Sequence, residues 1–176
     1  MSILKIIKTT AFSLVTLAVI SCSSDTPDTD TDDISKIRNL IQPAQNIWAG
    51  GQPNKNQFIT FAQMGVKHVV NLRPTAELDW NEGEYVESLG IKYYLIPVDS
   101  VDDISPENAK RLADILQRVG ADKTLVHCAS GNRVGALKAF SAGTLDGKTT
   151  EEAIAHGKSW GMTSLEPEVR QKLLSR

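Results

Sequence analysis

The 176-residue sequence has few of the side chains from which metal centres and disulfide frameworks are built, with only two cysteines and three histidines. His68, His127 and His156 stand at no metal-ligand spacing with Cys128, so no metal or other cofactor is predicted. Hydrophobic residues make up 41% of the chain and charged residues 23%, which suits one globular domain of ordinary size. The fold therefore has to rest on a hydrophobic core.

The sequence also lacks any cluster of basic residues, and its formal net charge is −2. We therefore expect no nucleic acid as a partner, because binding to its phosphates needs such a cluster. No apolar run reaches the about 20 residues that a membrane-spanning helix needs. The main apolar run covers only residues 11–20, so a transmembrane anchor fits the sequence less well than a cleaved signal.

Lys5 and Lys8 precede that run, and the residues VISC follow at 19–22, a pattern that resembles a bacterial lipoprotein signal with its lipobox. We expect residues 1–21 to be the signal peptide, Cys22 to carry lipid, residues 22–33 to be an acidic flexible tether and residues 34–176 to be the folded domain. Cleavage removes both lysines and leaves a net charge of −4. This places the protein in the bacterial cell envelope, facing the periplasm and touching the membrane only through its lipid. Ser23 favours the outer membrane.

Lipidation of Cys22 leaves Cys128 without an intramolecular partner in a compartment that favours disulfides. Such a thiol could be no more than a small buried hydrophobic residue. The glycine and arginine that follow it, Gly131 and Arg133, favour a chemical role instead.

Strand and helix signals alternate from residue 46 onward at the spacing of βα units. Strands are expected at 47–50, 67–72, 91–96 and 124–127, and helices at about 54–65, 81–89, 105–119, 133–145, 150–160 and 167–174. The predicted fold class is α/β, with a mostly parallel sheet of about four to five strands flanked by helices on both faces. Ligands bind such sheets at the carboxyl ends of the strands, where Arg73, Asp99 and Cys128 occur.

Residues 124–137, TLVHCASGNRVGAL, indicate a strand, a tight loop and a helix. Gly131 permits a positive φ, and backbone N–H groups converge at the helix start, which attracts anions and favours the thiolate of Cys128. A thiolate facing the Arg133 fork suits transfer of a tetrahedral oxyanion such as phosphate. The expected anion-binding residues are those between the two: Ala129, Ser130, Gly131 and Asn132. His127 should point to the opposite face from Cys128, as a hydrogen-bonded scaffold residue.

Residues 125–135, LVHCASGNRVG, resemble the His-Cys-x-x-Gly-x-x-Arg signature of cysteine-dependent protein tyrosine and dual-specificity phosphatases. The segments GGQP at 50–53, VVNLRP at 69–74 and LIPVD at 95–99 occur in the order seen in atypical dual-specificity phosphatases. The sequence is most similar to the phosphatase-like domain also found attached to bacterial beta-lactamase-like hydrolases. The resemblance covers about residues 40–147 and implies a dual-specificity-phosphatase-like fold that hydrolyses a phosphomonoester through a phosphocysteine.

The loop departs from that signature in length, because only four residues separate Cys128 from Arg133, where those phosphatases have five. Rhodanese-like sulfurtransferases, which carry a persulfide on the cysteine, use a loop of this shorter kind. Val134 also stands where many phosphatases have a serine or threonine that helps the thiolate leave. Two alternatives therefore stay open: a sulfurtransferase using a Cys128 persulfide, and a non-catalytic module that binds a phosphate ligand.

A phosphatase needs an acid for the leaving oxygen, and carboxylates serve in the family. Asp99 is the first candidate because it ends the strand where similar enzymes keep their acid, and Asp102 and Asp103 follow it. Arg73 and Gln52 follow strand ends at the same cleft, where they could contact substrate or only pin a loop. The expected partner is a phosphorylated protein or small molecule, and the sequence identifies neither the substrate nor the oligomeric state.

Overall fold

The computed structural model describes residues 33–175, so the predicted signal peptide, Cys22 and nearly all of the predicted tether lie outside the described residues. Five strands form the sheet: β1 (Ile41–Ala44), β2 (Ile47–Gly50), β3 (His68–Asn71), β4 (Lys92–Leu95) and β5 (Thr124–His127). Six α-helices surround it: α1 (Lys55–Gln63), α2 (Glu82–Ser88), α3 (Pro106–Val119), α4 (Asn132–Thr144), α5 (Thr150–Ser159) and α6 (Glu166–Leu174). Three short 3-10 helices are η1 (Ile34–Lys36), η2 (Thr75–Glu77) and η3 (Val101–Asp103).

The strands are ordered β1-β2-β5-β3-β4, and β5 therefore lies in the middle of the sheet. β2, β5, β3 and β4 run parallel to one another, and only β1 at the edge is antiparallel to its neighbour. His127 at the end of β5 pairs with Gly50 on one side and Asn71 on the other. The carboxyl ends of the parallel strands therefore meet around the residue that follows His127.

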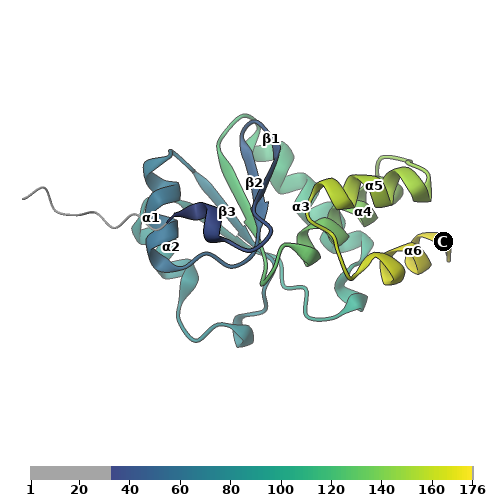
Figure 1. Cartoon of the computed structure of the whole chain (residues 1–176), viewed down its shortest axis with the longest axis horizontal. Helices are drawn as coiled ribbons and strands as arrows, with labels where there is room; N and C mark the ends of the chain where they lie inside the picture. Colours follow the sequence, from purple (N-terminus) through teal and green to yellow (C-terminus); the bar gives the residue numbers. More distant parts are fainter. Residues whose placement is uncertain (1–32, 176) are drawn as a thin grey trace, which may run out of the picture.

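The sheet is covered on both faces, and each face has its own hydrophobic core (Figure 1). Trp48, Val69 and Leu125 pack with the residues of α1 and α2. Ala49 and Val126 point the other way and pack with α3, α4, α5 and α6. Because neighbouring strand residues alternate between faces, each strand contributes to both cores.

The predicted α/β class and the mostly parallel sheet are confirmed, and every predicted strand and helix is present with ends shifted by no more than two residues. Strand β1 was not predicted, because Pro43 interrupts its pattern. Proline is tolerated in this strand because β1 is the edge strand and its pairing with β2 is irregular between Ile41 and Ala44. Within residues 33–175, no helix is both long and apolar enough to cross a membrane.

Helix α4 follows the predicted loop and lies between the sheet and the helices α3, α5 and α6. Its approach to α5 is very close: a Cβ on Gly135 would lie 2.5 Å from the carbonyl oxygen of Gly157 and 2.1 Å from the amide nitrogen of Met162. Any residue larger than glycine at position 135 would push these helices apart. Because Gly135 lies in the first turn of α4, this close packing fixes the position of the N-terminus of α4.

Candidate functional site

The site is assembled at the carboxyl edge of the sheet from the segments that follow β2, β3, β4 and β5. These segments carry Gln52, Arg73, Asp99 and Cys128 in that order. The amide of Cys128 donates a 3.2 Å hydrogen bond to the carbonyl of Gly50, which continues the β2 to β5 pairing into the loop. The structure thus brings the ends of these strands to one place, as the strand pattern predicts.

Cys128 is fully buried, and its Sγ accepts a 3.1 Å hydrogen bond from the amide of Gly131. Gly131 has φ of +83° and caps helix α4, which begins at Asn132. The first amides of a helix have no partners within it, so they are available to an anion. Cys128 and the start of α4 therefore form the thiol and amide arrangement that the sequence indicates.

Neighbouring segments hold the loop in place on two sides. The Asn39 side chain donates a 2.8 Å hydrogen bond to the carbonyl of Ser130, and Ser130 also forms a β-bridge with Gly51. On the other side, Asn132 Oδ1 accepts from the amide of Thr163 at 2.8 Å, and Asn132 Nδ2 donates to the Ser164 hydroxyl at 2.8 Å. The Asn132 side chain is thus tied to the connection between α5 and α6, which leaves its backbone for the anion.

Arg133 lies in the first turn of α4 and is held by two acceptors. Its Nη1 donates to the carbonyl of Val98 at 3.0 Å, and its Nη2 lies 2.8 Å and 2.9 Å from the two carboxylate oxygens of Glu77. The hydrogen bond and charge of Arg133 keep the pKa of Glu77 below its ordinary value of 4.5, with Arg73 adding to the effect. Glu77 therefore fixes the position of the arginine.

Arg73 holds Glu77 in turn. Its Nε donates to the Glu77 carboxylate at 3.0 Å and its Nη2 donates to the Glu77 carbonyl at 2.6 Å, while Nη1 donates to Oε1 of Gln52 at 2.7 Å. These contacts match the loop-pinning role that the sequence left open for Arg73 and Gln52. Direct contact of either residue with substrate stays a prediction.

A buried carboxylate, Glu82 in the first turn of α2, lies next to Gln52. It accepts a hydrogen bond from Tyr93 Oη at 2.9 Å and a short one from Gln52 Nε2. Nε2 of His127 lies 3.1 Å from Glu82 Oε1, outside the geometry of a regular hydrogen bond. Burial raises the pKa of Glu82, but the contacts with His127, Gln52 and Tyr93 outweigh that effect and lower the pKa below 4.5.

His127 is fully buried and packs edge-on against Phe58 of α1 at 5.8 Å between ring centres. Cys128, the next residue, belongs to the hydrophobic core on the opposite face of the sheet. The two side chains therefore diverge as expected for neighbours in an extended chain, and His127 has the surroundings of a scaffold residue.

The three candidate acids differ in their surroundings. One carboxylate oxygen of Asp103 accepts from the amides of Asp99 and Ser100 at 3.0 Å and 2.9 Å, which lowers the pKa of Asp103. Asp102 is fully exposed, 3.9 Å from the Lys172 ammonium. Asp99 is exposed and directly follows Val98, whose carbonyl holds Arg133. Of the three, Asp99 is joined most directly to the anion-binding arginine.

A hollow of about 550 Å³ opens beside this network. It is lined by Gln52, Pro53, Asn54, Lys55, Arg73, Glu77, Asp79 and Trp80. A larger hollow of about 820 Å³ lies near Asn46 and Lys123, at the amino ends of β2 and β5 and thus at the far edge of the sheet from Cys128. Because chemistry in parallel sheets takes place at the carboxyl edge, the smaller hollow is the relevant one. Residues 33–175 contain no cluster of three or more His, Cys, Asp and Glu side chains that could hold a metal ion.

The sequence did not reveal Glu77 and Glu82 as site residues. Glu77 stands four residues after Arg73, a spacing that indicates a local ion pair rather than a partner for Arg133. Glu82 follows the N-cap Asn81, where an acidic residue is expected for its favourable interaction with the helix dipole. Only the fold shows that these side chains reach Arg133 and His127.

Comparison with known proteins places the chain among phosphatase-like proteins in fold. No family model matches the chain. Two curated relatives, both named "Beta-lactamase hydrolase-like protein" and both from Xylella fastidiosa, are 31% and 32% identical to it over 132 residues. The alignment covers 69% of this chain and 30% of each relative, so the chain spans about a third of the length of these proteins.

Solved structures show the same fold. A "putative phosphatase (DUF442)" from Shewanella putrefaciens CN-32 is 26% identical, with a TM-score of 0.61 over 82% of this chain and 93% of that one. A "putative phosphatase" from Neisseria meningitidis is 22% identical, with a TM-score of 0.60 over 77% of this chain and 95% of that one. TpbA from Pseudomonas aeruginosa, in complex with phosphotyrosine, is 17% identical, with a TM-score of 0.58 over 81% of this chain and 85% of that one. The resemblance predicted from residues 125–135 is confirmed, and the chain has the α/β fold of cysteine-dependent phosphatases.

Proposed function

We propose that the protein is a phosphatase that hydrolyses a phosphomonoester with Cys128 as its nucleophile. The observation that carries this proposal is the meeting of three groups: the buried Cys128 thiol, the N-terminus of α4 and the Arg133 guanidinium held by Glu77 and Val98. A nucleophile, a set of amide donors and a cationic fork are what transfer of a phosphoryl group requires. Phosphatase-like neighbours in fold support the same class of reaction.

The reaction proceeds in two displacements. The Cys128 thiolate forms a bond to phosphorus while the bond to the leaving oxygen breaks, and that oxygen takes a proton from an acid. Water then attacks the phosphocysteine, the same carboxylate now accepts its proton, and phosphate leaves as the thiolate returns. Arg133, with the amides of Ala129, Ser130, Gly131 and Asn132, binds the oxygens that do not react.

Asp99 is the acid in this proposal. Asp103 is engaged by the amides of its own loop and holds that loop closed, which suits it to a structural role. Asp102 points into solvent. Asp99 is also exposed, but its neighbour Val98 contacts Arg133 directly.

The substrate is a phosphorylated protein or small molecule. The complex of TpbA with phosphotyrosine supports a phosphorylated substrate, because the two proteins share their fold. The hollow of about 550 Å³ beside Arg73 and Glu77 offers room for the group that carries the phosphate. No cofactor and no nucleic acid enter the proposal.

A sulfurtransferase is the second candidate, and the length of the loop favours it. Helix α4 begins at Asn132, so only Ala129, Ser130 and Gly131 form the turn between the cysteine and the helix. This six-residue loop from Cys128 to Arg133 encloses a smaller anion than the longer phosphatase loop does. In that reaction Cys128 would attack the outer sulfur of thiosulfate, become a persulfide and release sulfite.

The location follows from the N-terminal sequence. We propose that the mature chain begins at Cys22, carries lipid there and faces the periplasm from the membrane, with Ser23 favouring the outer membrane. The sequence pattern of residues 5–22 supports this proposal.

A paired assay tests the activity. Purified protein kept under reductant is given an aryl phosphate in one reaction and thiosulfate with a sulfur acceptor in another. Phosphate release that disappears in Cys128→Ser, with no sulfur transfer, supports the proposal. Sulfur transfer without phosphate release overturns it in favour of the second candidate.

A further inference from the structure

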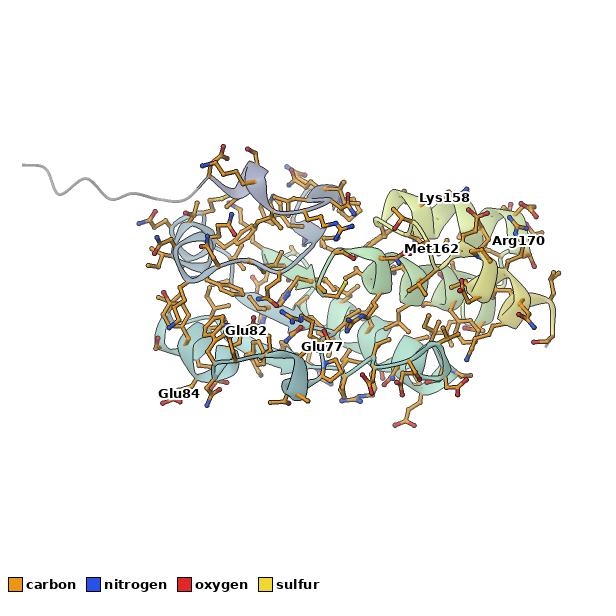
Figure 2. All side chains as sticks on the ribbon, turned by 60° about the horizontal axis from the view of Figure 1, so that its bottom comes forward. Glu77, Glu82, Glu84, Lys158, Met162 and Arg170 are labelled. Carbon is orange, nitrogen blue, oxygen red and sulfur yellow. The ribbon has the colours of Figure 1, made fainter. Side chains whose placement is uncertain are left out.

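The buried carboxylate of Glu82 is not used by the two displacements, yet it touches three residues of the site. In Figure 2, Glu82 and Glu77 lie within the outline of the molecule, whereas Glu84, which belongs to the same helix as Glu82, lies at its outer edge. Glu82 is 1% exposed. A buried carboxylate is costly unless donors surround it, so its contacts must offset that cost.

Two hydrogen-bonded routes connect Arg73 with Glu82. In the first, Arg73 Nη1 donates to Gln52 Oε1, and Gln52 Nε2 donates to Glu82. In the second, the Arg73 amide donates to Asn71 Oδ1 at 2.7 Å, Asn71 Nδ2 donates to Tyr93 Oη at 2.8 Å, and Tyr93 Oη donates to Glu82. Each route therefore starts at a donor and ends at Glu82.

The chemistry of the two ends fixes the direction of both routes. A guanidinium can only donate and a carboxylate can only accept, whereas an amide side chain can do either according to how it is turned. With Glu82 as acceptor, Gln52 has to turn its NH₂ inward, and its carbonyl oxygen then faces Arg73. An amide in place of Glu82 would remove the constraint at the inner end and leave only Arg73 and the Pro53 carbonyl, which accepts from Gln52 Nε2 at 3.0 Å, to orient Gln52.

We infer that Glu82 is a positioning residue, which sets the orientation of Gln52 and thereby the place of Arg73, Glu77 and finally the anion-binding Arg133. Arg73 holds both the carboxylate and the carbonyl of Glu77, and Glu77 holds Arg133. The inference rests on the proposed oxyanion-binding role of Arg133. The inference goes beyond that role, because it names the buried Glu82 carboxylate as the group on which the position of Arg133 depends.

The test exchanges the carboxylate of Glu82 and the amide of Gln52. Glu82→Gln keeps the shape of the side chain but replaces the charged acceptor of Gln52 with a neutral amide. It should weaken vanadate binding by about tenfold, the usual effect of losing a hydrogen bond to a charged group. The double variant Gln52→Glu with Glu82→Gln puts the carboxylate next to Arg73 and the amide inside. Arg73, Tyr93 and the new inner amide then each meet an acceptor, although the Pro53 carbonyl loses its donor. This variant should therefore recover part of the affinity that Glu82→Gln loses.

Glu84→Gln, on the exposed side of α2, is the matched control and should bind vanadate as the wild type does. The inference is overturned if Glu82→Gln binds vanadate like the wild type, or if the double variant binds no better than Glu82→Gln. Should Glu82→Gln fail to fold, a folded double variant that binds vanadate supports the inference, and an unfolded one counts against it. A wild-type protein that binds no vanadate would instead contradict the proposed function.

Discussion

Arg133 illustrates how much of the site depends on residues far away in the sequence. Its guanidinium is held by Val98 and Glu77, 35 and 56 residues earlier in the chain. The sequence motif identified Arg133 and Cys128, because a motif records residues that are neighbours along the chain. It could not identify Glu77, whose role depends on how η2 lies against α4.

The ion pair of Glu77 with Arg133 and Arg73 gives a prediction about acid stability. Because the pKa of Glu77 in the folded protein lies below its ordinary value of 4.5, the pair stabilises the fold above that pH and loses its effect as pH falls through the lowered pKa. Glu77→Gln should therefore lower the free energy of unfolding near neutral pH, and the difference from wild type should shrink in acid. Urea unfolding between pH 7 and pH 3 measures this, and Glu84→Gln serves as the control. A difference that stays constant over this pH range would contradict the account.

The role of Asp99 can be tested through the leaving group. An acid that protonates the leaving oxygen contributes about 10²–10⁴-fold to the rate, and most for poor leaving groups. Asp99→Asn should slow hydrolysis of an alkyl or simple aryl phosphate far more than that of an activated nitroaryl phosphate. Rate measurements with both classes decide, and equal slowing of the two would remove Asp99 as the acid and return attention to Asp102.

At the scale of elements, the order and type of helices and strands were predictable because each carries a local signal. The N-cap residues Asn54 and Ser105 begin α1 and α3 as expected, and Asn54 forms a complete capping box. The edge strand β1 was missed because its pairing with β2 outweighs the unfavourable Pro43. The apolar positions spread around α4 indicate that other helices, α5 among them, cover it, and this is confirmed. The closeness of the contact at Gly135 was beyond prediction, since Gly135 resembles a residue of the signature and not a packing position.

That contact predicts a large loss of stability on a small change. A methyl group at position 135 would overlap the backbone of Gly157 and Met162, so Gly135→Ala should destabilise the fold by about 1–3 kcal/mol or more. Thermal or urea unfolding measures the loss. Ala155→Leu adds more atoms at an exposed position of α5 and should change stability by less than about 0.5 kcal/mol. Equal effects of the two substitutions would show that the helices can separate at no cost.

At the scale of the whole molecule, the domain is predicted to be anchored to the membrane by a lipidated Cys22 and an acidic tether. Mass spectrometry of the N-terminal peptide from membranes should find lipid on Cys22, and Cys22→Ser should release the protein from them. An unmodified Cys22, or a chain that still begins at Met1, would contradict the proposed location. The activity of the domain should be the same in both forms, because the site lies wholly within residues 33–175.

The central claim is that Cys128 carries a phosphoryl group during turnover, and the mass of that residue tests it most directly. The reaction with an aryl phosphate is quenched in acid within its first turnover. The mass of the peptide that contains Cys128 is then measured by mass spectrometry and compared with that of the same peptide from protein treated with thiosulfate. We predict the mass of a phosphoryl group on Cys128 in the first sample and no added sulfur in the second. Added sulfur in the second sample, with no phosphoryl group in the first, would contradict the claim and identify the six-residue loop as that of a sulfurtransferase.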